Sequence, residues 1–87
     1  MSPDRRLCPD RVRSAFELYR DQHVPPGDFV RACLENNLLE AFLAADDDNL
    51  EAMPHIVAWL YWEMPSNLWK SMANVRAHLS GGKEAKA

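Results

Sequence analysis

Residues 10–22 read DRVRSAFELYRDQ, and the spacing of the apolar side chains in this stretch decides the fold class. One helix face would carry them at i, i+3, i+4 and i+7: Val12, Ala15, Phe16 and Tyr19. Stretches with the same period recur along the chain, whereas its 87 residues include one isoleucine, five valines and no threonine. Because strands favour β-branched side chains, the sequence predicts an all-α fold, a compact single-domain bundle of four to five short helices.

The segment after this first helix allows two interpretations. Two prolines and a glycine end the first helix, and we expect a second helix to start near residues 26–28. Its apolar period continues beyond Asn36 and Asn37, so one long helix is an alternative. A capping box formed by Asn37 and Glu40 favours a break, as does the tolerance of asparagine for the left-handed conformation that ends helices. We therefore predict a separate short helix over residues 38–44.

The aspartates of residues 46–49 are typical of a helix start, because they cap the chain and complement the helix dipole. We expect the regular part of this fourth helix to begin after about Asn49 and to end near Glu63. Pro54 would then be tolerated near the first turn. The alternative is a helix that kinks at Pro54.

A last helix is expected over residues 72–79, with Ser71 as its N-cap and Ser80-Gly81-Gly82 at its end. The helical domain would thus span residues 1–82, followed by a flexible tail over residues 83–87. Residues from all the expected helices must meet to form a core. The predicted core consists of Val12, Phe16, Tyr19, Phe29, Cys33, Leu34, Leu38, Phe42, Ile56, Leu60 and Val75.

Neither the start of the chain nor its apolar stretches predict export or a membrane segment. The first residues, MSPDRR, are not followed by an apolar run, so no signal peptide is expected. The longest apolar stretch is residues 56–61, whereas a membrane span needs about 20 residues. Cys8 and Cys33 form no Cys-x-x-Cys pair, and without a secretion signal we expect two reduced thiols, with a disulfide as the alternative. These features predict a cytoplasmic protein without membrane contact.

Motifs of catalytic and nucleotide-binding sites are missing from the sequence, which has no G-x-S-x-G, G-x-G-x-x-G or phosphate-binding loop. The acidic run also fails as a calcium-binding loop, because Glu51 stands where such a loop needs glycine and Val57 where it needs glutamate. The three histidines fall on different expected elements: His23, His55 and His78. A zinc site built from them and a cysteine is the alternative to ordinary surface histidines. We expect no catalysis, no cofactor and no metal.

The net charge of −3 conceals an uneven distribution of charges. Residues 1–31 hold six basic and five acidic side chains, and residues 70–87 hold four basic and one acidic. The middle, residues 32–69, has no basic side chain and seven acidic ones: Glu35, Glu40, Asp46, Asp47, Asp48, Glu51 and Glu63. Such a segment attracts basic proteins and repels phosphates, so no DNA or RNA binding is expected. Any weak phosphate contact would involve the only basic cluster: Arg5, Arg6, Arg11 and Arg13.

Four aromatic residues lie within eleven positions: Trp59, Tyr61, Trp62 and Trp69. They either pack at the centre of the bundle or form an exposed patch for a partner. In the second interpretation, acidic side chains steer a basic partner and aromatic side chains anchor it. The predicted partner-binding residues are Asp46, Asp47, Asp48, Glu51, Tyr61, Trp62 and Trp69. The same tryptophans could instead close a homodimer, and the acidic side chains could form only a solvated face.

More than half of the chain resembles small proteins encoded by tailed phages and prophages. The residues that carry the resemblance are HVPPGDF (23–29), LENNL (34–38), EAF (40–42), Ala45-Asp46, Asn49, Ala52-Met53 and YWEMPS (61–66). The sequence departs from the pattern at Lys70, where we expect a glycine before Ser71.

The resemblance implies a phage origin, and phage proteins of this size commonly bind host or defence proteins, including CRISPR–Cas complexes. We therefore predict a non-enzymatic phage-encoded protein that binds and modulates or inhibits a host or defence protein complex with a basic surface. It would act in the bacterial host cytoplasm. The alternative is a self-associating structural or assembly factor of the phage.

Overall fold

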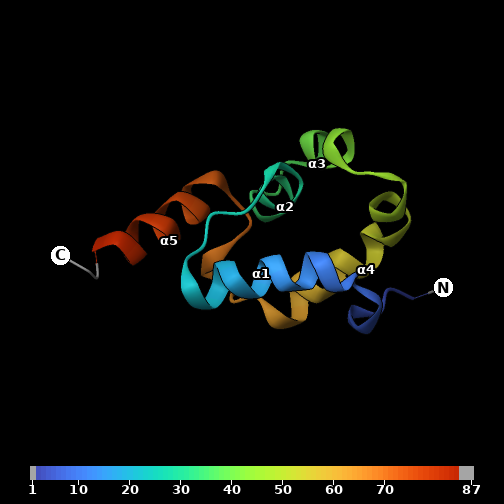
Figure 1. Ribbon diagram of the computed structural model, residues 1–87, viewed down its shortest axis with the longest axis horizontal. Helices are drawn as coiled ribbons and strands as arrows, with labels where there is room; N and C mark the ends of the chain where they lie inside the picture. Colours follow the sequence, from blue (N-terminus) through green and yellow to red (C-terminus); the bar gives the residue numbers. More distant parts are fainter. Residues whose placement is uncertain (1, 85–87) are drawn as a thin grey trace.

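The computed structural model describes the backbone of residues 2–84 and the side chains of residues 2–81, and Figure 1 shows its helices. The α-helices are α1 (Asp10–Gln22), α2 (Asp28–Leu34), α3 (Leu38–Ala44), α4 (Asp47–Glu63) and α5 (Met72–Glu84). Two short 3-10 helices, η1 (Arg5–Leu7) and η2 (Ser66–Leu68), precede α1 and α5. No strand occurs in the described part of the chain, and the predicted all-α class is confirmed.

The centre of the core lies where α1 packs against α4. The Phe16 ring stacks on that of Trp59, with 5.4 Å between centroids, and the Tyr19 hydroxyl donates a 2.6 Å hydrogen bond to the carbonyl oxygen of Leu68. Buried aromatic rings remove large apolar areas from water, so the stacked rings of Phe16 and Trp59 stabilise the fold strongly. Eight predicted core residues are buried: Val12, Phe16, Tyr19, Cys33, Leu34, Ile56, Leu60 and Val75. Phe29 is half-buried against them.

Two predicted core residues are exposed instead, and both belong to α3. Leu38 is 69% exposed and Phe42 is 44% exposed, so their assignment to the core is wrong. The reason is the packing of α3, which lies mainly against α2 and buries only Ala41. The turn before α3 reorients the helix, and the apolar period of α2 therefore does not carry over to it.

That turn is the predicted break between the second and third helices. Asn36 has a φ of 59°, in the left-handed region, and the amide of Asn37 donates to the carbonyl oxygen of Ala32 at 2.9 Å. The side chain of Asn37 then accepts a hydrogen bond from the amide of Glu40 at 3.3 Å, which caps α3. The break and both bounds of the short helix are confirmed.

Helix α4 begins earlier than the sequence predicts. The carboxylate of Asp46 caps it by accepting a 2.8 Å hydrogen bond from the amide of Asn49, so the regular helix starts at Asp47 and the expected start after Asn49 is wrong. Pro54 consequently lies inside the helix. Proline removes a backbone donor there and bends the helix, and Figure 1 shows the first turns of α4 directed away from the remainder.

Helix α5 has the predicted start and a different end. The Ser71 hydroxyl accepts a 3.1 Å hydrogen bond from the amide of Asn74, which confirms the N-cap. The helix continues through both glycines to Glu84, so the predicted end at Ser80-Gly81-Gly82 is wrong. Glycine ends a helix readily only where it adopts positive φ, and no glycine of the described residues does so. The rest of the predicted tail, residues 85–87, lies outside the described residues.

Candidate functional site

The predicted acidic residues gather at the start of α4. Asp46 caps the helix and pairs with Arg11, with 3.3 Å between carboxylate oxygen and guanidinium nitrogen. Asp47, Asp48 and Glu51 are exposed in the first turns and form no ion pair among the described side chains. Their carboxylates are therefore available to a partner.

The predicted aromatic residues do not form one group. Tyr61 and Trp62 are 70% and 65% exposed at the end of α4, where their rings meet edge to face at 5.1 Å. Arg5 lies over the Trp62 ring, 5.6 Å from its centroid. Trp59 is buried in the core, so the aromatic residues of α4 serve both packing and an exposed patch.

Acidic and aromatic side chains lie at opposite ends of α4. Tyr61 lies 14 positions after Asp47, which corresponds to about 21 Å along a straight helix, and the bend at Pro54 shortens the direct distance between them. Trp69 is half-buried beside Leu60 and lines a different part of the molecule. The structure therefore brings Tyr61 and Trp62 together, and separates them from the acidic residues and from Trp69.

The cysteines and histidines form no reactive centre. Cys8 and Cys33 are buried and unpaired, and burial raises the pKa of the Cys8 thiol to about 11 and that of Cys33 to about 12. Both stay protonated at neutral pH, and protonated thiols are poor nucleophiles and poor metal ligands. Among the described residues, no three or more side chains of the metal-binding types converge on one point.

The histidines instead make structural contacts. His55 accepts a 2.9 Å hydrogen bond from the amide of Asp4, which ties the segment before η1 to α4. His78 lies 2.7 Å from the carbonyl oxygen of Tyr19 through its Nε2, and its ring stacks on His23 with 4.1 Å between centroids. These contacts fasten α5 to the end of α1.

Helix α3 exposes four large apolar side chains, two of which, Leu38 and Phe42, the sequence predictions placed in the core. Leu39 and Leu43 are 66% and 71% exposed, and Leu38 and Phe42 are exposed beside them. At 100° per residue, these four side chains fall within an arc of about 140°. In most helices an apolar arc of this width faces the core. We call the four residues the α3 surface: Leu38, Leu39, Phe42 and Leu43.

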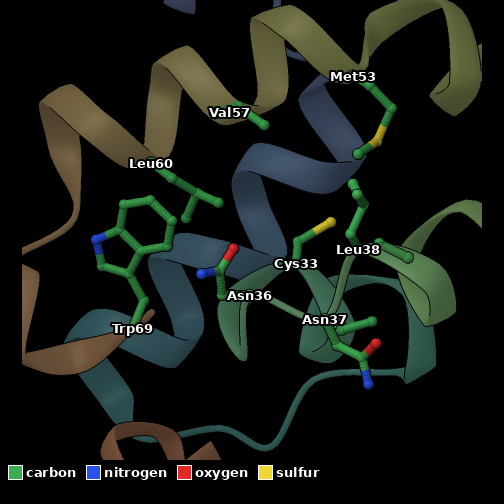
Figure 2. A pocket seen from close by; sticks show the side chains of 10 residues that line it. Cys33, Asn36, Asn37, Leu38, Met53, Val57, Leu60 and Trp69 are labelled. Carbon is green, nitrogen blue, oxygen red and sulfur yellow. The ribbon is translucent and has the colours of Figure 1, made fainter. Parts of the chain in front are cut away.

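An apolar groove of about 150 Å³ adjoins the α3 surface. Figure 2 shows it between α3 and α4, with Met53 and Leu38 at one end and Leu60 and Trp69 at the other. Val57 of α4 and Cys33 of α2 also contribute to its apolar lining. A dry apolar cavity of this volume has room for a benzene ring, so the groove can receive one large apolar side chain.

The other flank of α3 is acidic. A shallow hollow of about 380 Å³ there is lined by residues of α2 and α3, among them Asp28, Glu35, Glu40 and Leu43. Arg31 also lines this hollow, and its guanidinium pairs with Glu35 at 3.0 Å. Asp28 and Glu40 have no ion-pair partner among the side chains that the structure describes. The α3 surface thus lies between an apolar groove and a negatively charged hollow.

One signal in the sequence could have indicated this surface. Residues 38–44 read LLEAFLA, in which six of seven residues are apolar, more than one buried face of a two-turn helix can use. Such a helix is buried on all sides or exposes apolar side chains. The choice depends on which elements pack around it.

No helix among the described residues combines the length and apolar character that crossing a membrane requires. No family model, curated protein or solved structure matches the chain.

Proposed function

We propose that the protein is a non-catalytic protein-binding domain that docks onto its partner through the α3 surface and the adjoining groove. The observation that carries this proposal is the outward position of four large apolar side chains on one helix. Soluble monomers rarely expose contiguous apolar patches larger than a few hundred Å², and such patches commonly serve for binding.

The groove supports the proposal because it supplies a place for an anchor. Binding energy at protein interfaces is concentrated in a few large side chains that fill pockets on the other protein. Here the pocket is apolar, and Val57 and Leu38 at its rim belong to two different helices. An anchoring side chain inserted between them would contact α2, α3 and α4 together.

The resemblance to phage proteins extends the proposal to a kind of partner. We propose that the domain modulates or inhibits a host or defence protein complex that has a basic surface, such as a CRISPR–Cas complex, in the cytoplasm of a bacterial host. The acidic residues around α3 support this choice, because they would speed the approach to a basic surface. Tyr61 and Trp62 offer a second exposed patch for a large partner.

The test compares three immobilised proteins in quantitative affinity capture from bacterial lysate. The wild type is compared with Leu39→Glu/Leu43→Glu, which charges the α3 surface, and with Leu7→Glu/Leu18→Glu, which adds the same charge at exposed leucines outside α3. We expect the wild type and the control to enrich the same protein, and the α3 variant to lose at least about 90% of it, since charged groups at a buried contact cost several kcal/mol.

Circular dichroism must show that both variants remain folded. Glutamate has nearly the helix propensity of leucine, so α3 should tolerate the changes. If all three proteins capture the same proteins in equal amounts, α3 is not the binding surface and the proposal is wrong.

A further inference from the structure

We infer that the partner segment covering the α3 surface is a basic amphipathic helix, with apolar side chains on one face and lysine or arginine beside that face. The inference rests on the proposed function and adds the chemistry of the partner. It is carried by the combination of the apolar groove, the acidic hollow and the lack of strands in the described residues.

The charge of the partner follows from the carboxylates around α3. Ion pairs within the protein occupy Glu35, Asp46 and Glu63, which bind Arg31, Arg11 and Arg5. Carboxylates without such a pair among the described side chains remain in the hollow beside α3, from Asp28 and Glu40, and in the first turns of α4, from Asp47, Asp48 and Glu51. A segment lying on the α3 surface places an edge near the hollow, where basic side chains are attracted and acidic ones are repelled.

The helical form follows from the backbone. The described residues contain no strand, so α3 and its surroundings offer no sheet edge to which an extended segment could add itself. An extended segment pressed onto an apolar surface would leave amides and carbonyls without hydrogen-bond partners. A helix satisfies its own backbone and presents only side chains, which suits a surface made of leucine and phenylalanine.

The dimensions agree with this form. Helix α3 has seven residues and is about 10 Å long. Apolar residues at i, i+3, i+4 and i+7 of a partner helix extend over the same distance. One of them would enter the groove beside Val57, while its neighbours cover Leu39 and Leu43.

A second copy of this chain fits the same surface poorly. A two-fold dimer through α3 would place the same surface patch of both copies together. The unpaired carboxylates of Asp28 and Glu40 would then meet a patch of the same sign, because Arg31, the basic side chain that lines the hollow, is already paired with Glu35. Such an arrangement repels itself at low salt.

The test uses two displayed peptide libraries, each about 18 residues long, or five helical turns. One library has apolar residues at helical spacing and the other at alternate positions, and all other positions are randomised over Lys, Arg, Glu, Asp, Gln and Ser. Both are selected on the wild-type protein and counter-selected on Leu39→Glu/Leu43→Glu. We expect enrichment from the helical library alone, with basic residues exceeding acidic ones at least about threefold beside the apolar face.

Titration calorimetry then measures the best peptide at about 50 mM and about 500 mM NaCl. We expect affinity to fall at least about tenfold at the higher salt, and the Leu7→Glu/Leu18→Glu control to bind like the wild type. Enrichment of neutral, acidic or alternating peptides would overturn the helix proposal while leaving α3 as a binding surface. Enrichment that does not depend on α3 would overturn it as well.

The capture experiment separates the two proposals. If a captured protein depends on α3 but docks through a segment that is not a basic helix, only this inference fails. A homodimer that Leu39→Glu/Leu43→Glu separates into monomers would replace the basic helix with a second copy.

Discussion

Lys70 has a backbone conformation that residues other than glycine rarely adopt. Its φ of 86° lies in the left-handed region that favours glycine, and its amide donates a 2.7 Å hydrogen bond to the carbonyl oxygen of Leu34. This bond joins the end of α2 to the segment before α5, so the conformation is imposed by tertiary structure. A residue with a Cβ atom loses about 1 kcal/mol or more in this conformation.

We therefore expect Lys70→Gly to raise the free energy of unfolding by about 0.5–1 kcal/mol, the gain being limited by the greater freedom of glycine in the unfolded chain. Urea denaturation followed by circular dichroism measures the change. Lys70→Ala is the control, because it also removes the ammonium group 5.6 Å from the Trp69 ring but keeps the Cβ atom. Equal stabilisation by both variants would show that the charge, and not the backbone, is responsible.

The buried thiols predict a dependence of stability on alkaline pH. Burial raises the pKa of Cys33 to about 12 and that of Cys8 to about 11, whereas the unfolded chain ionises its thiols near the ordinary value of 9.0. Above that pH the unfolded state loses protons that the folded state keeps. The free energy of unfolding should therefore fall from about pH 9 upward, by at most about 1.4 kcal/mol per pH unit for Cys33.

Urea denaturation at pH 8, 9 and 10 in the presence of a reductant tests this dependence. Tyr19 would add to the decline only above about pH 10, because burial raises its pKa from 10.0 to about 12. In Cys8→Ala/Cys33→Ala the decline between pH 9 and 10 should be clearly smaller than in the wild type. An unchanged slope would mean that the thiols remain accessible to water.

At the scale of the elements, α4 depends on one side chain at its start. The Asp46 carboxylate accepts the amide of Asn49 and also pairs with Arg11. We expect Asp46→Ala to lower the free energy of unfolding by about 1 kcal/mol, the usual effect of losing an N-cap. Asp46→Asn is the matched control, since asparagine caps equally well and loses only the exposed ion pair. If both variants lower the free energy of unfolding by similar amounts, the effect is due to the ion pair with Arg11 and not to the cap.

Helix α3 should be the least stable α-helix of those whose side chains are fully described. Only Ala41 of its seven residues is buried, whereas α1 and α4 bury large aromatic and aliphatic side chains. Local opening of α3 therefore exposes little additional apolar surface. Amide hydrogen exchange by NMR should show α3 exchanging at lower protection than α1 and α4, and a bound partner should raise its protection. Equal protection in all three helices would contradict this.

Local signals predicted much of this structure, and failures occurred where packing decides. The periodicity at Phe16 and Tyr19 and the cap at Asn37 act within one or two turns, and both were predicted correctly. The exposure of Leu38 depends on the absence of a packed neighbour, which no local pattern contains. Tyr61 and Trp62 were predicted as binding residues and are exposed, but their separation from Asp47 along α4 follows from the helix itself and could have been expected from the sequence.

At the scale of the whole molecule, the protein is elongated, measuring 46 × 23 × 19 Å. The acidic start of α4 and the aromatic residues at its end face different surroundings, so one small partner cannot cover both. Because the carboxylates around α3 repel their equivalents, we expect a monomer of 10.0 kDa at about 50 mM NaCl. Light scattering coupled to size-exclusion chromatography measures this mass. A dimer at low salt would contradict the charge argument.

The outward side chains of α3 also bear on how this sequence can change over generations. Leu39 and Leu43 are mostly exposed, so we expect their replacement to leave the fold intact. Residues such as Phe16 and Ile56 have no such freedom, because each is fully enclosed. If α3 binds the partner as proposed, recognition and foldability reside at separate positions, and we expect a lineage that follows a rapidly diverging target to vary at α3 more than at the enclosed residues.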